Sequence, residues 1–342
     1  MAFRKLAIFA VLLAAIGSPL TADDKASLQP LYDIAGDKVF KEYAANPVLK
    51  PGAPGEFDAG ALGTMTVVKV NGVYHMYFEV WGRLHDHTLE EYETLQIGHA
   101  TSQDGVHWTK DPANPVIPHG GPNDFDNYGA WDPFVLYEDG KFKMWYGGGV
   151  PKGPGIHFKC PWGYAESTDG YHWVKKGEIS PNDNIPDDED DRVVHDKKTG
   201  HYFMYYMNHL TGNSIFRAES PDEMHFDYTH AIPINIDGLP WGKVFKYPQT
   251  FQVGDTWYML FGVSGGDNGN DSTGIASSSD GVHWTPRNPR LLPRAHDSAL
   301  LKVADDLYVI YYGPNRQQDQ AACDIRLAVF KGTLQDMLTP GK

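Results

Sequence analysis

Ser102-Gln103-Asp104-Gly105-Val106-His107-Trp108 recurs along the chain. This repeat indicates the fold class. The other copies are Ser167-Thr168-Asp169-Gly170-Tyr171-His172-Trp173, Ser279-Asp280-Gly281-Val282-His283-Trp284 and the weaker Ser220-Pro221-Asp222-Glu223-Met224-His225-Phe226. An Asp-Gly pair forms the tight turn of a β-hairpin, since glycine takes positive φ at no steric cost. The repeat therefore predicts hairpins at matching places of successive units, with the final aromatic residue packing on the next strand.

A second pattern precedes each of the four copies and occurs once more near the C-terminus, with no such copy after it. It consists of a short strand, a turn and an aromatic strand. Its five copies are Thr66–Val70 with Val73–Phe78, Phe134–Tyr137 with Phe142–Tyr146, Val193–His195 with Tyr202–Met207, Thr250–Val253 with Trp257–Phe261, and Ala299–Val303 with Leu307–Tyr312. Third strands are expected at Ile97–Ala100, Trp162–Ala165, Ile215–Ala218, Gly274–Ala276 and Ile325–Phe330. Four strands in roughly fifty residues make a propeller blade. The sequence thus predicts an all-β, five-bladed β-propeller of four-stranded antiparallel blades.

The N-terminus has the pattern of an export signal. Arg4 and Lys5 precede an apolar run, Leu6–Ile16, that is too short for a bilayer span of ~20 residues, and small residues follow up to Ala22. We therefore expect a signal peptide over residues 1–22, an exported protein, and a single propeller domain over 23–342. Asp33–Ala44 is the one helix expected, and Asn46-Pro47-Val48-Leu49, which echoes Asn114-Pro115-Val116-Ile117, is expected to close the ring against the last blade.

Net charge and cysteine content limit the classes of partner that we expect. The net charge of -15 becomes -17 once Arg4 and Lys5 are removed, and the chain has no basic run. Nucleic acid and anionic membrane surfaces attract clustered Lys and Arg, so neither is an expected partner. The two cysteines, Cys160 and Cys323, are too few for a usual zinc site, and the sequence leaves open whether they form a disulfide.

The first strand of each blade surrounds the central channel, so polar residues at the starts of these strands should meet there. Cleavage of a glycosidic bond commonly needs two carboxyl groups, one ionised and one protonated. The catalytic candidates are Asp58, Asp132, Asp191 and His296, and the candidates for sugar binding are Trp81, Arg83, Trp131, Arg192, Lys246, Tyr247 and Asp297. The alternative for Asp58 is a turn cap. The repeated histidines are interpreted as turn residues, and no metal site is expected.

These features together resemble the five-bladed propeller glycoside hydrolases of families 43, 32, 62, 117 and 130. The shared features are the Asp-Gly-x-x-Trp repeat, Asp58 before the first inner strand, and Trp131-Asp132-Pro133 at the start of the second blade. In families 43 and 32 a first-blade Asp is base or nucleophile, a later Asp orients and tunes, and a later Glu is the acid. The resemblance assigns the first role to Asp58 and the second to Asp132 or Asp191.

The third role departs from that pattern, because Lys246-Tyr247-Pro248 stands where a Glu is expected. Lysine cannot replace a carboxylic acid directly. In family 117 a histidine takes the acid's role, which makes His296 a candidate by analogy. Glu79, Glu91 and Glu93 are further candidates, and the sequence does not choose among them.

The leading hypothesis from the sequence is an exported glycoside hydrolase with a carbohydrate substrate. One alternative is a polysaccharide lyase, in which Lys246, Tyr247 or His296 moves the protons. Another is a propeller that binds glycans without turnover. None of these requires a cofactor, although the loop Gly265-Gly266-Asp267-Asn268-Gly269-Asn270-Asp271 has the oxygen ligands of a structural Ca²⁺ site.

Overall fold

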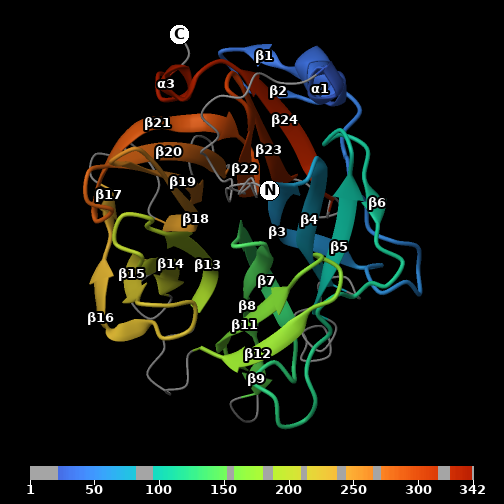
Figure 1. Cartoon of the computed structure of the whole chain (residues 1–342), viewed down its shortest axis with the longest axis vertical. Coiled ribbons are helices and arrows are strands. Elements are labelled where there is room, and N and C mark those ends of the chain that lie inside the picture. Colours follow the sequence, from blue (N-terminus) through green and yellow to red (C-terminus); the bar gives the residue numbers. More distant parts are fainter. Residues whose placement is uncertain are drawn as a thin grey trace, which may run out of the picture.

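The computed structural model describes residues 22–81, 95–151, 158–179, 188–208, 214–236, 244–264, 271–314 and 324–340. The strands of this part of the chain form blades that stand around one axis (Figure 1). Each second strand is buried on both faces, which explains its nearly continuous apolar sequence. In blade 1, for example, Met76 and Phe78 pack toward blade 5, whereas Tyr77 packs toward blade 2.

Five blades are present, as the repeat predicts. The first strands are β3 (Ala61–Val70), β7 (Ala130–Glu138), β13 (Asp188–His195), β18 (Val244–Val253) and β22 (Ala295–Ala304). The second strands are β4 (Val73–Trp81), β8 (Lys141–Gly148), β14 (Tyr202–Asn208), β19 (Thr256–Ser264) and β23 (Leu307–Pro314). The third strands are β5 (Gln96–Ser102), β11 (Trp162–Ser167), β15 (Ser214–Ser220), β20 (Ser272–Ser278) and β24 (Arg326–Lys331).

The outer strands complete the blades. They are β6 (Thr109–Lys110), β12 (Val174–Glu178), β16 (Asp227–Pro233) and β21 (His283–Pro293), with β17 (Asn235–Ile236) added in parallel to β21. A small hairpin, β9 (Val150–Pro151) with β10 (Phe158–Lys159), extends from blade 2, and a short helix, α3 (Leu334–Met337), follows β24. The first strands pack side by side around the axis, and β22 returns to β3.

The N-terminal segment completes blade 5, as expected from the Asn-Pro echo. Its strands β1 (Gly36–Asp37) and β2 (Lys41–Glu42) pair with β24. Asn46 then exchanges two hydrogen bonds with the backbone of Leu327, just as Asn114 does with His99 in blade 1. The chain ends are therefore held in one sheet, which covers an edge that would otherwise be open.

The helix expected at Asp33–Ala44 is wrong in its position. The helix is α1, which spans Ala22–Ile34, and the residues after it form β1 and β2. The physical reason is that the backbone groups along the edge of β24 need partners, and pairing with this segment satisfies them. Tertiary pairing has thus overridden local helical preference.

The Asp-Gly repeat forms one defined turn. In its first copy the Ser102 hydroxyl accepts the Gly105 N–H at 2.8 Å, and the Asp104 carboxylate accepts the His107 N–H at 2.9 Å. Asp104 also binds the exposed His107 ring at 2.8 Å, and the other three copies repeat this Asp–His contact. The repeated histidines are therefore turn residues, as interpreted from the sequence.

The backbone of each turn accepts a hydrogen bond from an aromatic side chain of the preceding blade. Tyr77 donates its hydroxyl to the Gly170 carbonyl at 2.8 Å, Tyr205 to Gly281 at 2.8 Å, and Tyr311 to Gly105 at 2.6 Å. At the remaining junction with a repeat, the Trp145 indole donates to the Glu223 carbonyl at 2.8 Å. The aligned residue of blade 4 is Leu260, and blade 5 carries no such turn to receive a donor.

The tryptophan of the repeat contributes to the same junction. Trp108 meets Tyr311 edge to face with ring centroids 5.4 Å apart, and Trp173 meets Tyr77 in the same way at 5.3 Å. Such aromatic pairs add to the free energy gained by burying the rings. The Tyr311–Gly105 contact is the copy that closes the ring, because it joins blade 5 to blade 1.

We expect Tyr311→Phe to lower the free energy of unfolding by about 1–3 kcal/mol, because the buried Gly105 carbonyl loses its donor. Tyr74→Phe is the matched control. It removes a buried hydroxyl of the same interface that has no hydrogen-bond partner within the described residues, so little change is expected. Urea unfolding of both variants at neutral pH measures the difference, and equal losses would contradict the role of the Tyr311 contact.

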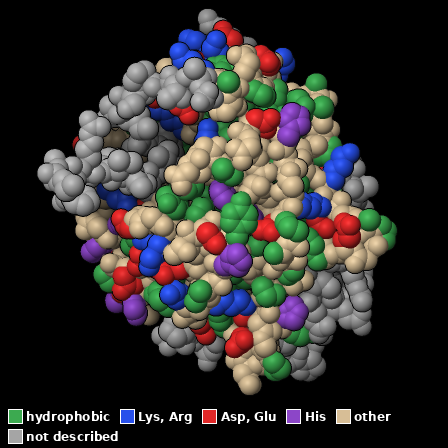
Figure 2. Space-filling view, turned by 45° about the vertical axis from the view of Figure 1, so that its right-hand side comes forward, with side chains coloured by type: hydrophobic (Ala, Val, Ile, Leu, Met, Phe, Trp, Pro, Cys, Tyr) green, Lys and Arg blue, Asp and Glu red, His purple; other side chains and the backbone are tan. Residues whose placement is uncertain are grey.

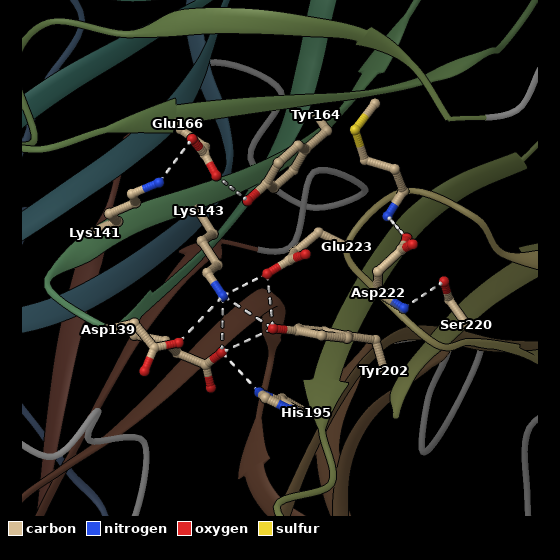
Figure 3. A network of polar contacts seen from close by, with 12 residues as sticks. Asp139, Lys141, Lys143, Tyr164, Glu166, His195, Tyr202, Ser220, Asp222 and Glu223 are labelled. Atoms are coloured by element: carbon tan, nitrogen blue, oxygen red, sulfur yellow. Dashed lines mark hydrogen bonds and ion pairs between the residues drawn. The ribbon is translucent and has the colours of Figure 1, made fainter. Parts of the chain in front are cut away.

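A polar network joins blades 2 and 3 at the C-terminal ends of their first strands (Figure 3). Lys143 lies at its centre and contacts Glu223 at 2.6 Å, the Tyr202 hydroxyl at 2.9 Å and Glu138 at 3.5 Å. Glu138 also binds His195 and Lys197. Burial raises the pKa of the Glu138 carboxyl, but the hydrogen bonds from His195 and Lys197 outweigh it and bring the pKa from 4.5 to about 2.

The sign of this shift predicts a pH dependence. Because folding lowers the pKa of Glu138, its contribution to stability is complete above about pH 4.5 and is lost as the pH falls toward 2. Between about pH 4.5 and pH 2 the wild-type protein should lose free energy of unfolding through this group. We expect Glu138→Gln to reduce that loss by roughly 3 kcal/mol. Chemical unfolding measured across this pH range tests it, with Asp255→Asn on the surface as control.

Candidate functional site

Every first strand is distorted near its start. At this point two residues of the first strand oppose a single residue of the second strand, as in a β-bulge. The bulged pairs are Gly63–Thr64, Asp132–Pro133, Asp190–Asp191, Tyr247–Pro248 and Asp297–Ser298. Since the first strands surround the axis, these bulges lie around the same end of the ring of first strands, opposite the end that carries the Lys143 network.

Three of the bulges hold their first residue in a left-handed backbone conformation. The φ angles are 47° for Asp132, 55° for Tyr247 and 48° for Asp297. Such angles are uncommon outside glycine and are unfavourable for a ring-bearing side chain such as tyrosine. Backbone strain of this kind is typical of positions where the direction of a side chain serves function.

Blades 4 and 5 bring three predicted residues together. The His296 Nδ1 lies 2.8 Å from the Asp297 carboxylate, and its Nε2 lies 3.0 Å from the Tyr247 hydroxyl. Asp271, at the start of β20, approaches the same Nε2 at 3.7 Å. Both ring nitrogens of His296 are therefore engaged, so the imidazole is fixed between two blades.

Blade 2 supplies Asp132 and Trp131, which are both buried. The Trp131 indole lies across glycines of its own blade, because a Cβ added at Gly147 would lie 2.5 Å from its Nε1, and one at Gly149 would lie 2.6 Å from its ring. Trp131 thus forms a wall beside the bulge. The ring position is fixed by these glycines, which leave the space that the indole fills.

Blade 3 contributes a buried cation. Arg192 directly follows the bulge that contains Asp191, and its guanidinium lies 5.8 Å from the centre of the Phe134 ring in β7. A guanidinium can bind a carboxylate or phosphate through two parallel hydrogen bonds. The position of Arg192 puts this chemistry between blades 2 and 3, on the bulged end of the first strands.

Asp58 does not lie on a first strand, in contrast to the expectation. It lies in the turn before β3, and its buried carboxylate is bound by Lys110 of the outermost strand. Blade 2 repeats the arrangement with Asp126 and Lys175, which are 2.5 Å apart. Because the pairing repeats, we propose a structural role for Asp58, and its expected role as the base stays a prediction. The signal in the sequence is the repeat of Phe57-Asp58 as Phe125-Asp126.

Several predicted features lie outside what the structure describes. Arg83, Glu91, Glu93, Cys323 and residues 265–270 of the acidic loop fall in the gaps, as does the expected signal peptide up to residue 21. Lys246 is placed in β18 beside the bulge, and Trp81 ends β4. Within the described ranges no cluster of three or more His, Cys, Asp or Glu side chains could hold a metal ion.

The surface gives a mixed electrostatic picture. On the face in Figure 2, acidic and basic side chains alternate, and histidines lie among them. Of the helices in the described part of the chain, none has the length and apolar character to cross a bilayer.

The sequence did not predict Asp271 and Asp126 as members of buried polar contacts, since neither stands at the start of a first strand.

Comparison with known proteins decides the family. The model of glycoside hydrolase family 130, described as β-1,4-mannooligosaccharide phosphorylase, matches residues 64–236, about half of the chain. The chain belongs to glycoside hydrolase family 130. An uncharacterized protein of Mycobacterium tuberculosis is 26% identical over 254 residues, which are 72% of this family 130 chain and 81% of the relative. The sucrose-6-phosphate hydrolase of Escherichia coli is 27% identical over 206 residues, only 39% of its length.

Solved structures agree on the fold of this family 130 member. A β-1,2-mannobiose phosphorylase from Listeria innocua superimposes with a TM-score of 0.66 at 16% identity, covering 87% of this chain and 98% of the other. A family 117 glycoside hydrolase from Zobellia galactanivorans gives 0.61 at 15% identity, covering 86% and 90%. The expected kinship with the five-bladed propeller enzymes is confirmed, and the family makes the chain a glycan-active enzyme.

The structural role of Asp58 is testable. Asp58→Asn should lower the free energy of unfolding by about 1–3 kcal/mol, since Lys110 loses its buried partner at a site that water partly screens. Asp126→Asn should cost a similar amount through Lys175. Turnover per folded molecule should stay near wild type in both variants. A stable Asp58→Asn protein that has lost activity would restore the catalytic interpretation.

Proposed function

We propose that this chain is an exported glycoside hydrolase that cleaves short mannose-containing oligosaccharides at the bulged end of its channel. The observation that carries the proposal is the set of three strained bulges, whose residues Asp132, Tyr247 and Asp297 come from different blades. The family description and the mannobiose phosphorylase among the structural neighbours support a mannoside substrate. The pattern of residues 1–22 supports export.

Asp132 is the proposed base. Its carboxyl group is buried, and it stands in the bulge of β7 at the end of the first strands where we propose that substrate enters. A carboxylate in that position can remove the proton of an attacking water as the glycosidic bond breaks. Trp131 beside it provides an aromatic edge to the pocket.

His296 is better placed to hold a sugar than to protonate it. Its Nδ1 is bound to Asp297 and its Nε2 to the Tyr247 hydroxyl, so direct donation to a leaving oxygen would break one of these contacts. The fixed Tyr247 hydroxyl and imidazole are suited to orient sugar hydroxyls. The backbone of Asp191 lies in the bulge of blade 3 and that of Lys246 beside the bulge of blade 4, whereas their side chains lie outside what the structure describes, so their expected roles stay predictions.

Phosphorolysis is the second candidate, and Arg192 is the observation that favours it. A buried guanidinium beside the bulge of blade 3 could hold inorganic phosphate in place of the attacking water. The family description names a phosphorylase. In either reaction the same bond breaks, and the difference lies in which nucleophile reaches the sugar.

The products distinguish hydrolysis from phosphorolysis. We expect the mature chain to release reducing sugar from manno-oligosaccharides in phosphate-free buffer, and Asp132→Asn to lower this rate by roughly 10²–10⁴-fold, the usual contribution of a general base. Phosphorus NMR detects any sugar 1-phosphate. Turnover that requires phosphate would overturn hydrolysis, whereas binding without turnover of a broad glycan panel would support the non-catalytic alternative. An unsaturated uronide product would indicate a lyase.

A further inference from the structure

Blade 1 differs from the other blades at the bulged end of its second strand. When the second strands are aligned on their paired aromatic residues, Glu79 stands where blades 2, 4 and 5 have Gly147, Gly262 and Gly313. On the first strand the difference is reversed. In the same alignment, Gly63 stands where blades 2, 4 and 5 have Trp131, Lys246 and His296. Blade 1 has thus exchanged the places of glycine and the larger side chain.

The exchange is also seen in the packing. A Cβ added at Gly63 would lie 2.8 Å from the Glu79 Oε1, so the carboxyl group of Glu79 occupies the space beside the first strand. In blade 2 the reverse holds, since a Cβ at Gly147 would lie 2.5 Å from the Trp131 indole. Glu79 is therefore carried by β4 but delivers its carboxyl group to the bulge of β3, and it is buried there.

Glu79 lies on the side of β4 that packs toward blade 2, the blade that carries Asp132. Side chains alternate along a strand, so Glu79 lies on the same face as Tyr77, whose hydroxyl binds Gly170 of blade 2. In β5, Ile97 pairs with Glu79 and Gln96 with Val80. The neighbouring Leu95 carbonyl accepts the N–H of Ala130, two residues before Asp132, at 3.0 Å. The backbone thus holds the end of β4 and the start of β7 at one junction.

We propose that Glu79 is the general acid of this enzyme and works with Asp132 as a carboxyl pair at the junction of blades 1 and 2. The inference rests on the proposed function. The protonated Glu79 gives its proton to the glycosidic oxygen as the bond from that oxygen to C1 breaks. Water adds to C1 and gives a proton to Asp132, so two sugars leave with Glu79 ionised and Asp132 protonated. One proton passing from Asp132 to Glu79 through solvent restores the starting state.

This assignment explains the missing acid of the fourth blade. The pattern of families 43 and 32 expects a Glu where Lys246 stands, and a search of the first strands alone finds no glutamate at any bulge. The carboxylic acid is instead supplied from a second strand, over a glycine. With Glu79 as the acid, the proposed reaction does not need Lys246 to donate a proton.

Substrates with different leaving groups test the assignment, because an activated phenol departs without protonation and a sugar does not. In Glu79→Gln we expect kcat/KM to fall by roughly 10²–10⁴-fold on a manno-oligosaccharide and by less than about tenfold on 2,4-dinitrophenyl β-mannoside. The basic limb of the pH profile on the oligosaccharide should disappear. Glu79→Gly, which copies the residue of three other blades, should behave in the same way and guards against misfolding of the first variant.

Two controls make the outcome decisive. Glu138→Gln removes a buried carboxylate at the opposite end of β7 and should leave the ratio of the two substrates at its wild-type value. In His296→Gln both substrates should lose activity together, because His296 is assigned to sugar binding. The assignment of Glu79 is overturned if its variants lose both substrates equally or neither, or if His296→Gln shows the leaving-group effect. A wild-type chain that cleaves no glycoside refutes the proposed function itself, before any variant is compared.

Discussion

The hydrogen bond from an aromatic side chain of one blade to a turn carbonyl of the next is the constraint on which the ring depends. A blade packs on its neighbours mainly through apolar side chains, and apolar contact alone fixes no register between sheets. The contacts of Tyr77, Trp145, Tyr205 and Tyr311 fix that register, since each donor reaches a single carbonyl. The junction of blades 4 and 5 uses a different device, in which the Gln249 side chain exchanges two hydrogen bonds with the backbone of Leu300.

The repeat made the architecture predictable because its chemistry is local. Asp104 and Gly105 determine their turn within a few residues, and the five copies of the strand-turn-strand pattern give the number of blades. The helix was misplaced for the opposite reason: whether residues 36–42 become helix or strand depends on the edge of β24, almost three hundred residues away along the chain. Asn46 shows the middle case, since its resemblance to Asn114 allowed a long-range contact to be inferred from a short motif.

The site was predictable only where its residues lie on first strands. The positions of Asp132, Tyr247, His296 and Asp297 were predictable because the start of a strand can be recognised in the sequence, and the first strands of a propeller surround one axis. Asp58 precedes β3 by a turn, and its ion pair with Lys110 of the outermost strand could not be predicted from the alternation pattern. Glu79 could be named only as one of several acids, because its reach depends on the absent side chain of Gly63, a packing fact that no single-strand pattern contains.

Strain at the bulges links the fold to the proposed site. Glycine would relieve the positive φ of Asp132, Tyr247 and Asp297, yet each position keeps an ionisable or hydroxyl side chain. Left-handed residues outside glycine cost of order 1–3 kcal/mol each, and a ring that is locked at its junctions can sustain them. Where blade 1 does place glycine at its bulge, Glu79 fills the space from the adjacent strand. The molecule therefore keeps a polar group at the bulge of blade 1 too, by a route that leaves its backbone unstrained.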